Sequence, residues 1–313
     1  MLSLARLSGV LSQLPHDSRA RGIEIEATSL ANLIKTLFDL EQTSITDKTV
    51  FHDKAITDLE KARSAVGIWR AVAPEFADLF EHLENSACAV VCFRRYDVTG
   101  DEKDLDRAEA YLLRSGEHHG WFPILQHRGI VKGFLFEHRT AESIAPDEIR
   151  KNWRELEKLA NEERQLYDEA LKLTVRSFDT SMLRNNRADS FMMEASVLRR
   201  IGDARAVDRL TSAETEIQES LLELEAGAIS FITAGEIECE LVGHRCNQLN
   251  EGDKVAALER IKSHFIRGVR MGFRDDKGKD KNEFRKRSVF QNLDCLGGNA
   301  FEEVWRIMCD PKY

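Results

Sequence analysis

The chain is poor in the residues that interrupt helices. Only 5 of its 313 residues are proline and 18 are glycine, whereas 32% are charged. An all-β protein needs more turn residues than this, because each of its short strands ends in a turn. The composition therefore predicts a helix-rich protein, and a hydrophobic content of 42% is enough for a substantial core.

Long apolar runs and an excess of positive charge are also missing. The longest apolar run, residues 87–93, is far shorter than the roughly 20 residues that span a bilayer as a helix, so we expect no membrane association. The net charge of −9 disfavours general nucleic-acid binding. Neutralising a phosphate backbone takes an excess of Lys and Arg.

Cysteine is present but not in the patterns of a metal or redox site. The six cysteines lie at positions 88, 92, 239, 246, 295 and 309, and none forms a CxxC pair. Most fall inside helical patterns, so we expect free thiols, a reducing compartment and a cytoplasmic location. Residues 1–18 combine one arginine with several serines, as transit peptides do. Leucines recur at helical spacing in the same stretch, which favours an ordinary amphipathic helix.

Signatures of familiar catalytic and cofactor sites are absent. The sequence has no Walker loop, GxGxxG, HExxH, EF-hand loop or GxSxG. Four of the nine histidines lie close together, at His118, His119, His127 and His138, but without the Cys and His spacings of structural zinc sites. We interpret them as loop histidines rather than metal ligands, and we expect no cofactor.

The apolar residues that are present recur with the period of helices. Stripes of this kind cover residues 30–40 and 56–69. Pro74 and Pro146 each open a further helix, because proline is tolerated at the first helical position. Amphipathic patterns continue to the C-terminus, including one helix of about six turns over residues 207–228. The predicted fold class is all-α.

Four regions follow from these patterns. Residues 1–115 form an N-terminal helical region, and 116–145 an irregular connector whose glycines, proline and histidines show little helical period. One or two short strands would fit in that connector. Residues 146–270 form a region of helix pairs. Residues 271–313 form a basic loop and a C-terminal helix that covers the open end of the array.

Three Gly-Asp dipeptides, at 100, 202 and 252, each separate two amphipathic segments of similar length. Gly allows the positive φ that ends a helix, and Asp can cap the next one. The stretch YDVTGDEKDLDRAEAY, residues 96–111, resembles a tetratricopeptide repeat of the kind found beside caspase-like CHAT domains. Ala108 takes the family's small position and Tyr96 its aromatic one. The other two pairs match more loosely, with Val207 where an alanine is usual.

This resemblance implies helix hairpins stacked as a solenoid, whose groove binds a peptide or a domain of another protein. The fold itself carries no chemistry. The resemblance therefore implies a non-catalytic adaptor or scaffold subunit of a multi-protein assembly, such as a bacterial signalling or defence system. The alternative is an irregular helical array, because any helix hairpin with a Gly-Asp turn shows the same pattern.

The one basic part of the chain lies between Lys262 and Arg287, where ten basic residues accompany four acidic ones. Its polar, glycine-containing middle indicates a mobile loop. The alternative is a docking site for an acidic protein surface or a nucleic-acid backbone, with phenylalanines that could stack on bases. The candidate binding residues are Arg267, Arg270, Arg274, Lys277, Lys279, Lys281, Arg285, Lys286 and Arg287.

Two enzyme classes are alternatives to the adaptor, beside a nucleic-acid-associated subunit. His119 and Cys295 lie in His-Gly and Asp-Cys dipeptides like those of caspase-like proteases, in which a histidine takes the proton of a cysteine nucleophile. Those dipeptides should end β-strands, whereas their surroundings here have helical patterns. Arg114 and His119 have the R-x4-H spacing of helical HEPN ribonucleases, although Gly116 interrupts that helix.

Overall fold

The computed structural model describes residues 74–114, 122–273 and 281–309. The helices expected over 30–40 and 56–69 lie outside these ranges. All elements of the described part are helices, and no strand occurs in it, so the all-α prediction is confirmed. The chain divides into two compact units, Met1–His119 and Gly120–Tyr313, and each is described by itself. None of the described helices is both long and apolar enough to cross a bilayer.

The described part of the first unit is a helix hairpin, formed by α4 (Pro74–Thr99) and α5 (Glu102–Arg114). The chain reverses at Gly100, whose φ is 65°. Asp101 then accepts a hydrogen bond from the backbone N–H of Lys103 at 3.1 Å and so caps α5. The predicted helix start at Pro74 and the predicted Gly-Asp turn are both confirmed.

The second unit begins with a hairpin of α6 (Phe122–Arg139) and α7 (Pro146–Leu171). The prediction of an irregular connector is therefore wrong over 122–139, which is one continuous helix. The reason lies in Gly129 and Gly133, which are not turn residues. A Cβ on either one would collide with a side chain of α7, so these glycines let the two helices approach closely. The predicted helix start at Pro146 is confirmed.

The next hairpin consists of α8 (Ser177–Arg200) and α9 (Ala206–Leu222). It turns at Gly202, whose φ of 75° confirms the second predicted Gly-Asp turn. The predicted helix over 207–228 is wrong at its end. The chain leaves the helix after Leu222, and Gly227 is the extended residue that precedes α10.

The third hairpin joins α10 (Ala228–Arg245) to α11 (Glu251–Arg270) through the short 3-10 helix η1 (Cys246–Gln248). The predicted turn at Gly252-Asp253 is wrong, because both residues lie in the first turn of α11. The N-cap is Asn250, whose side chain accepts from the Asp253 N–H at 2.9 Å, while the Asp253 carboxylate accepts from the Asn250 N–H at 3.3 Å. Asp253 is therefore the N3 residue of a capping box in α11, and it does not end the preceding helix.

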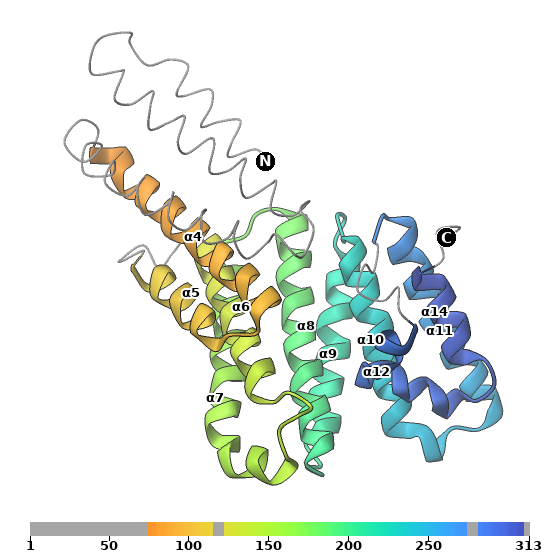
Figure 1. Cartoon of the computed structure of the whole chain (residues 1–313). Coiled ribbons are helices and arrows are strands. Elements are labelled where there is room, and N and C mark those ends of the chain that lie inside the picture. Colours follow the sequence, from red (N-terminus) through yellow and green to blue (C-terminus); the bar gives the residue numbers. More distant parts are fainter. Residues whose placement is uncertain (1–73, 115–121, 274–280, 310–313) are drawn as a thin grey trace. The chain divides into compact units, whose positions relative to one another are not determined.

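The C-terminal part packs onto α10 and α11 as four short helical segments: α12 (Lys281–Lys286), α13 (Ser288–Gln291), η3 (Asn292–Leu296) and α14 (Ala300–Cys309). Phe284 and Phe290 stack with ring centroids 4.1 Å apart and belong to the same apolar core as Phe265. All three rings are fully buried, so they are not available to stack on bases. The predicted C-terminal helix is confirmed. In Figure 1, α7, α8, α9 and α10 follow one another in chain order.

Candidate functional site

The described members of the predicted basic site fall into two groups. Arg267 and Arg270 lie in the last turn of α11, and both are exposed. Lys281, Arg285 and Arg287 lie further along the chain, in α12 and immediately after it. Arg274, Lys277 and Lys279 lie outside the described residues, as does the side chain of Lys286.

The second group is engaged within the fold. Lys281 pairs with Glu302 of α14 and lies over the Trp305 ring, 5.5 Å from its centroid. Arg285 donates to Asp294 at 2.9 Å, and the Arg287 guanidinium lies 5.3 Å from the Phe284 ring centroid. These contacts fasten α12 to α14 and η3. Part of the positive charge that the sequence presents is therefore balanced by neighbouring acids of the same chain.

Cys295 lies in η3 and forms a disulfide with Cys246 of η1, with the two Cα atoms 5.5 Å apart. The expectation of free thiols is therefore wrong for this pair. It holds for Cys88, Cys92 and Cys239, which are buried, and for Cys309. The two bonded cysteines are 49 residues apart in sequence, so only the packing of η3 on the end of α10 reveals their pairing. In this structure Cys295 is not a free thiol nucleophile.

Of the other residues named in the two enzyme hypotheses, the structure describes Arg114 but not His119. Arg114 is the last residue of α5 and is exposed, and its guanidinium lies 5.3 Å from the Tyr111 ring centroid. His119 lies outside the described residues. Of the clustered histidines, His127 and His138 are in α6, and burial lowers the pKa of His127 to about 4. The part of the chain that the structure describes contains no group of three or more side chains placed to hold a metal ion.

A buried ion-pair network links α7, α8 and α9. Glu194 of α8 is fully buried and lies 2.8 Å from Arg164 of α7 and 3.0 Å from Arg209 of α9. Arg164 also donates to Asn161 at 2.7 Å and lies over the Phe191 ring, 4.5 Å from its centroid. A buried carboxylate between two guanidiniums is electrostatically satisfied, which explains these residues through packing rather than catalysis.

Glu163 is a second buried carboxyl group in this part of the fold. It is 3% exposed, and Ser190 Oγ donates to its Oε2 at 2.7 Å. Burial raises the pKa of Glu163 to about 8, although Ser190 and Arg164 oppose the rise. Burial also raises the pKa of Tyr167, its hydrogen-bonded neighbour. A shifted pKa of this kind can mark an active site. Here the group is enclosed by helices α6, α7 and α8 and is out of reach of a substrate unless the bundle opens.

Large apolar side chains are exposed together at one end of the second unit. They come from two connections, α7–α8 and α9–α10, and from the ends of the helices beside them. Val175 and Leu224 are each 97% exposed. We name this set of six side chains the apolar end: Leu173, Val175, Phe178, Leu222, Leu224 and Ile229.

Contacts between the two connections show that they lie side by side. Ser177 Oγ donates to Glu223 Oε2 at 2.8 Å and accepts from the Glu225 N–H at 3.3 Å. A Cβ on Gly227 would lie 3.9 Å from the Phe178 ring. The polar groups of the two connections thus satisfy one another. Their apolar side chains remain in water, which costs free energy unless a partner covers them.

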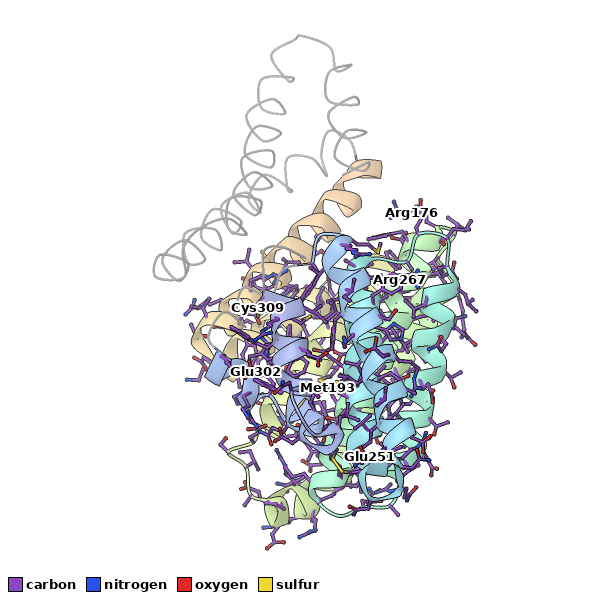
Figure 2. All side chains as sticks on the ribbon, turned by 90° about the vertical axis from the view of Figure 1, so that its right-hand side faces the viewer. Arg176, Met193, Glu251, Arg267, Glu302 and Cys309 are labelled. Carbon is purple, nitrogen blue, oxygen red and sulfur yellow. A yellow bond between two sulfur atoms is a disulfide. The ribbon has the colours of Figure 1, made fainter. Side chains whose placement is uncertain are left out.

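The last turn of α11 borders the apolar end. A Cβ on Gly268 would lie 3.1 Å from the carbonyl oxygen of Ala228, the residue before Ile229. Met271, which follows α11, is half exposed. Figure 2 shows Arg176 of the α7–α8 connection and Arg267 of α11 towards the same end of the unit, and Glu251 at the opposite end.

Sequence reasoning missed the apolar end because the helical spacing of apolar residues runs past the ends of α7 and α9. Leu173 and Leu224 both continue the seven-residue spacing of the helix before them, yet α7 ends at Leu171 and α9 at Leu222. The signal that could have revealed a break in this stripe was Gly227, which is the N-cap of α10, since glycine is favoured at N-caps and disfavoured inside helices. A comparison with protein-family models, curated protein sequences and solved structures found no match for this chain.

Proposed function

We propose that the chain is a protein-binding adaptor or scaffold subunit without catalytic activity of its own. The observation that carries this proposal is the apolar end, where six large apolar side chains from two adjacent connections and the helix ends beside them are exposed. A soluble protein rarely leaves a group of this kind uncovered, and such groups mark sites where another protein binds. The partner belongs to the same multi-protein assembly as this chain.

The state of the buried ionisable residues supports a binding role. Glu194 is held by Arg164 and Arg209, and Glu163 by Ser190, inside the helix bundle. These groups are explained by the packing of α7, α8 and α9. The tetratricopeptide-like character of residues 96–111 and a place in a bacterial signalling or defence system remain predictions.

Matched aspartate substitutions test the proposal. Val175→Asp and Leu224→Asp place a charge in the apolar end, whereas Val255→Asp places one on an apolar residue that is 64% exposed in the first turns of α11. Each tagged chain is used to isolate partners from its native source, and bound proteins are quantified by mass spectrometry. We expect one partner to be lost by at least about tenfold with both apolar-end variants and retained by the control.

The circular dichroism spectrum and the unfolding midpoint show that the variants are folded, since all three sites are exposed. Equal recovery of every bound protein by wild type, Val175→Asp and Leu224→Asp would refute the proposal. An enzymatic activity measured for the purified chain without a partner would refute the claim that the chain is not catalytic.

A further inference from the structure

The charges around the apolar end indicate which partner it fits. Within the two connections, Arg176 donates to Asp179 at 2.6 Å and 2.7 Å, and Glu223 accepts from Ser177. These polar groups are hydrogen-bonded to one another. A partner that binds the two connections would therefore contact mainly their apolar side chains. Lys172 and Glu225, which are exposed in the same two connections, carry opposite charges that offset each other, so the charge of the neighbouring edge decides which partner fits.

The edge that α11 supplies is positive. Arg267 and Arg270 are exposed in its last turn, and neither has an ion-pair partner among the described residues. The Arg267 guanidinium lies 4.3 Å from the ring centroid of Phe231, in the first turn of α10, which fixes its position at the start of that helix. We name Arg267 and Arg270 the arginine edge.

An arginine held over an aromatic ring and without a carboxylate is prepared to receive one. The guanidinium is planar, always charged and able to bind a carboxylate with two parallel hydrogen bonds. At the edge of a surface that excludes water, the interaction free energy of such an ion pair is more favourable than in bulk solvent. The arginine edge therefore complements acids that lie next to apolar anchors.

Resting on the proposed function, we propose that the apolar end and the arginine edge together bind an acidic amphipathic segment of a partner protein. Leu, Ile or Phe side chains of that segment cover Val175, Phe178 and Leu224. Asp or Glu side chains beside them pair with Arg267 and Arg270. The apolar contacts supply affinity, and the charges supply orientation and rate of association.

The test uses the full chain and a defined probe. A phage-displayed library of random peptides is selected on the immobilised protein, and the consensus peptide is synthesised with a fluorescent label. We expect the enriched sequences to combine apolar residues with Asp or Glu. We also expect the affinity to fall with rising salt, because ion pairs at a surface are screened.

Variants then separate the two parts of the site. Leu224→Asp should lower the affinity for the peptide by at least about tenfold, and the double change Arg267→Ser/Arg270→Ser should lower it by about threefold to tenfold. A peptide whose acids are replaced by Asn and Gln should bind wild type and the double variant equally. Val255→Asp and Arg245→Ser, both at the opposite end of the unit, are the matched controls and should leave the affinity unchanged.

Each other outcome overturns the inference in a distinguishable way. If peptides depend on Leu224 but not on the arginines, the adaptor function stands and the acidic partner is wrong. If they are indifferent to Leu224→Asp and Val175→Asp, both proposals are wrong. If no peptide is enriched and the chain self-associates in sedimentation through Leu224, the occupant is a second copy. If intramolecular cross-links show residues 1–73 on the apolar end, the occupant is the chain itself.

Discussion

The carboxylate of Glu163 in α7 occupies the space that Gly133 in α6 leaves open. A Cβ built on Gly133 would lie 2.6 Å from Glu163 Oε1, closer than van der Waals contact allows. One turn earlier, Gly129 faces the Tyr167 ring in the same way. Two glycines in α6 thus accommodate two side chains of α7, and the pairing of these helices depends on both.

Gly133→Ala should therefore lower the free energy of unfolding, although alanine favours a helix. The helix propensity gains about 1 kcal/mol, but overpacking against Glu163 costs about 1–3 kcal/mol. Urea unfolding followed by circular dichroism measures the difference. Gly252→Ala is the control, since its Cβ would meet one atom, Asn250 Oδ1, at the longer distance of 3.2 Å. Equal stability of both variants would contradict the close approach of α6 and α7.

The contribution of Glu163 to the stability of the second unit should fall as the pH rises from about 4.5 to about 8, whereas that of His127, whose pKa is lowered, should rise between about pH 4 and pH 6.5. Glu163 has an ordinary pKa of 4.5 when unfolded and a pKa of about 8 when folded. The folded chain therefore holds a proton that the unfolded chain has released over this range, and deprotonation favours unfolding. The contribution of Glu163 is fully present below about pH 4.5 and is lost as the pH passes about 8.

Glu163→Gln isolates this effect, because its amide carries no charge at any pH. The variant should gain stability relative to wild type between pH 5 and pH 8, by an amount on the order of a few kcal/mol. Unfolding in urea at both pH values measures the change. Glu162→Gln, at the neighbouring position of the same helix, is the matched control because its half-exposed carboxylate pairs with Lys132. An offset for Glu163→Gln that is the same at both pH values would show that its carboxyl is not desolvated.

Glu194→Ala should be among the most destabilising single changes in the chain. It leaves Arg164 and Arg209 facing each other without the carboxylate between them, and removing one partner of a buried pair costs about 3–5 kcal/mol. The exposed pair of Glu251 and Lys254 offers the comparison, and Glu251→Ala should cost about 1 kcal/mol or less. Thermal and urea unfolding measure both. Similar losses for the two variants would mean that the network is open to water.

Alkylation of the unfolded chain should label four cysteines without reductant and six with it, since Cys246 and Cys295 form a disulfide. Peptide mapping identifies the protected pair. Cys295→Ser should lower the free energy of unfolding by about 2–4 kcal/mol under oxidising conditions, because the crosslink no longer restricts the unfolded chain. With reductant present, variant and wild type should unfold together. Six labelled cysteines in chain purified without reductant would contradict the pairing.

Much of the helical architecture could be predicted because its signals are local. Proline at 74 and 146 marks helix starts, and glycine at 100 and 202 supplies the positive φ at which the chain reverses. The same residue types misled at 129 and 133, where glycine serves a contact between two helices. No local pattern distinguishes a glycine that ends a helix from one that lets another helix approach.

By itself the sequence determined the fold class, since helical periodicity and scarce turn residues act on each segment independently of the rest. Only the tertiary structure decided which residues meet. It joined Cys246 to Cys295, buried Glu194 between two arginines, and placed Gly227 beside Phe178 at the apolar end. The physical reason is that burial and pairing depend on segments far apart in the chain, and their side chains acquire a role only when the helices pack.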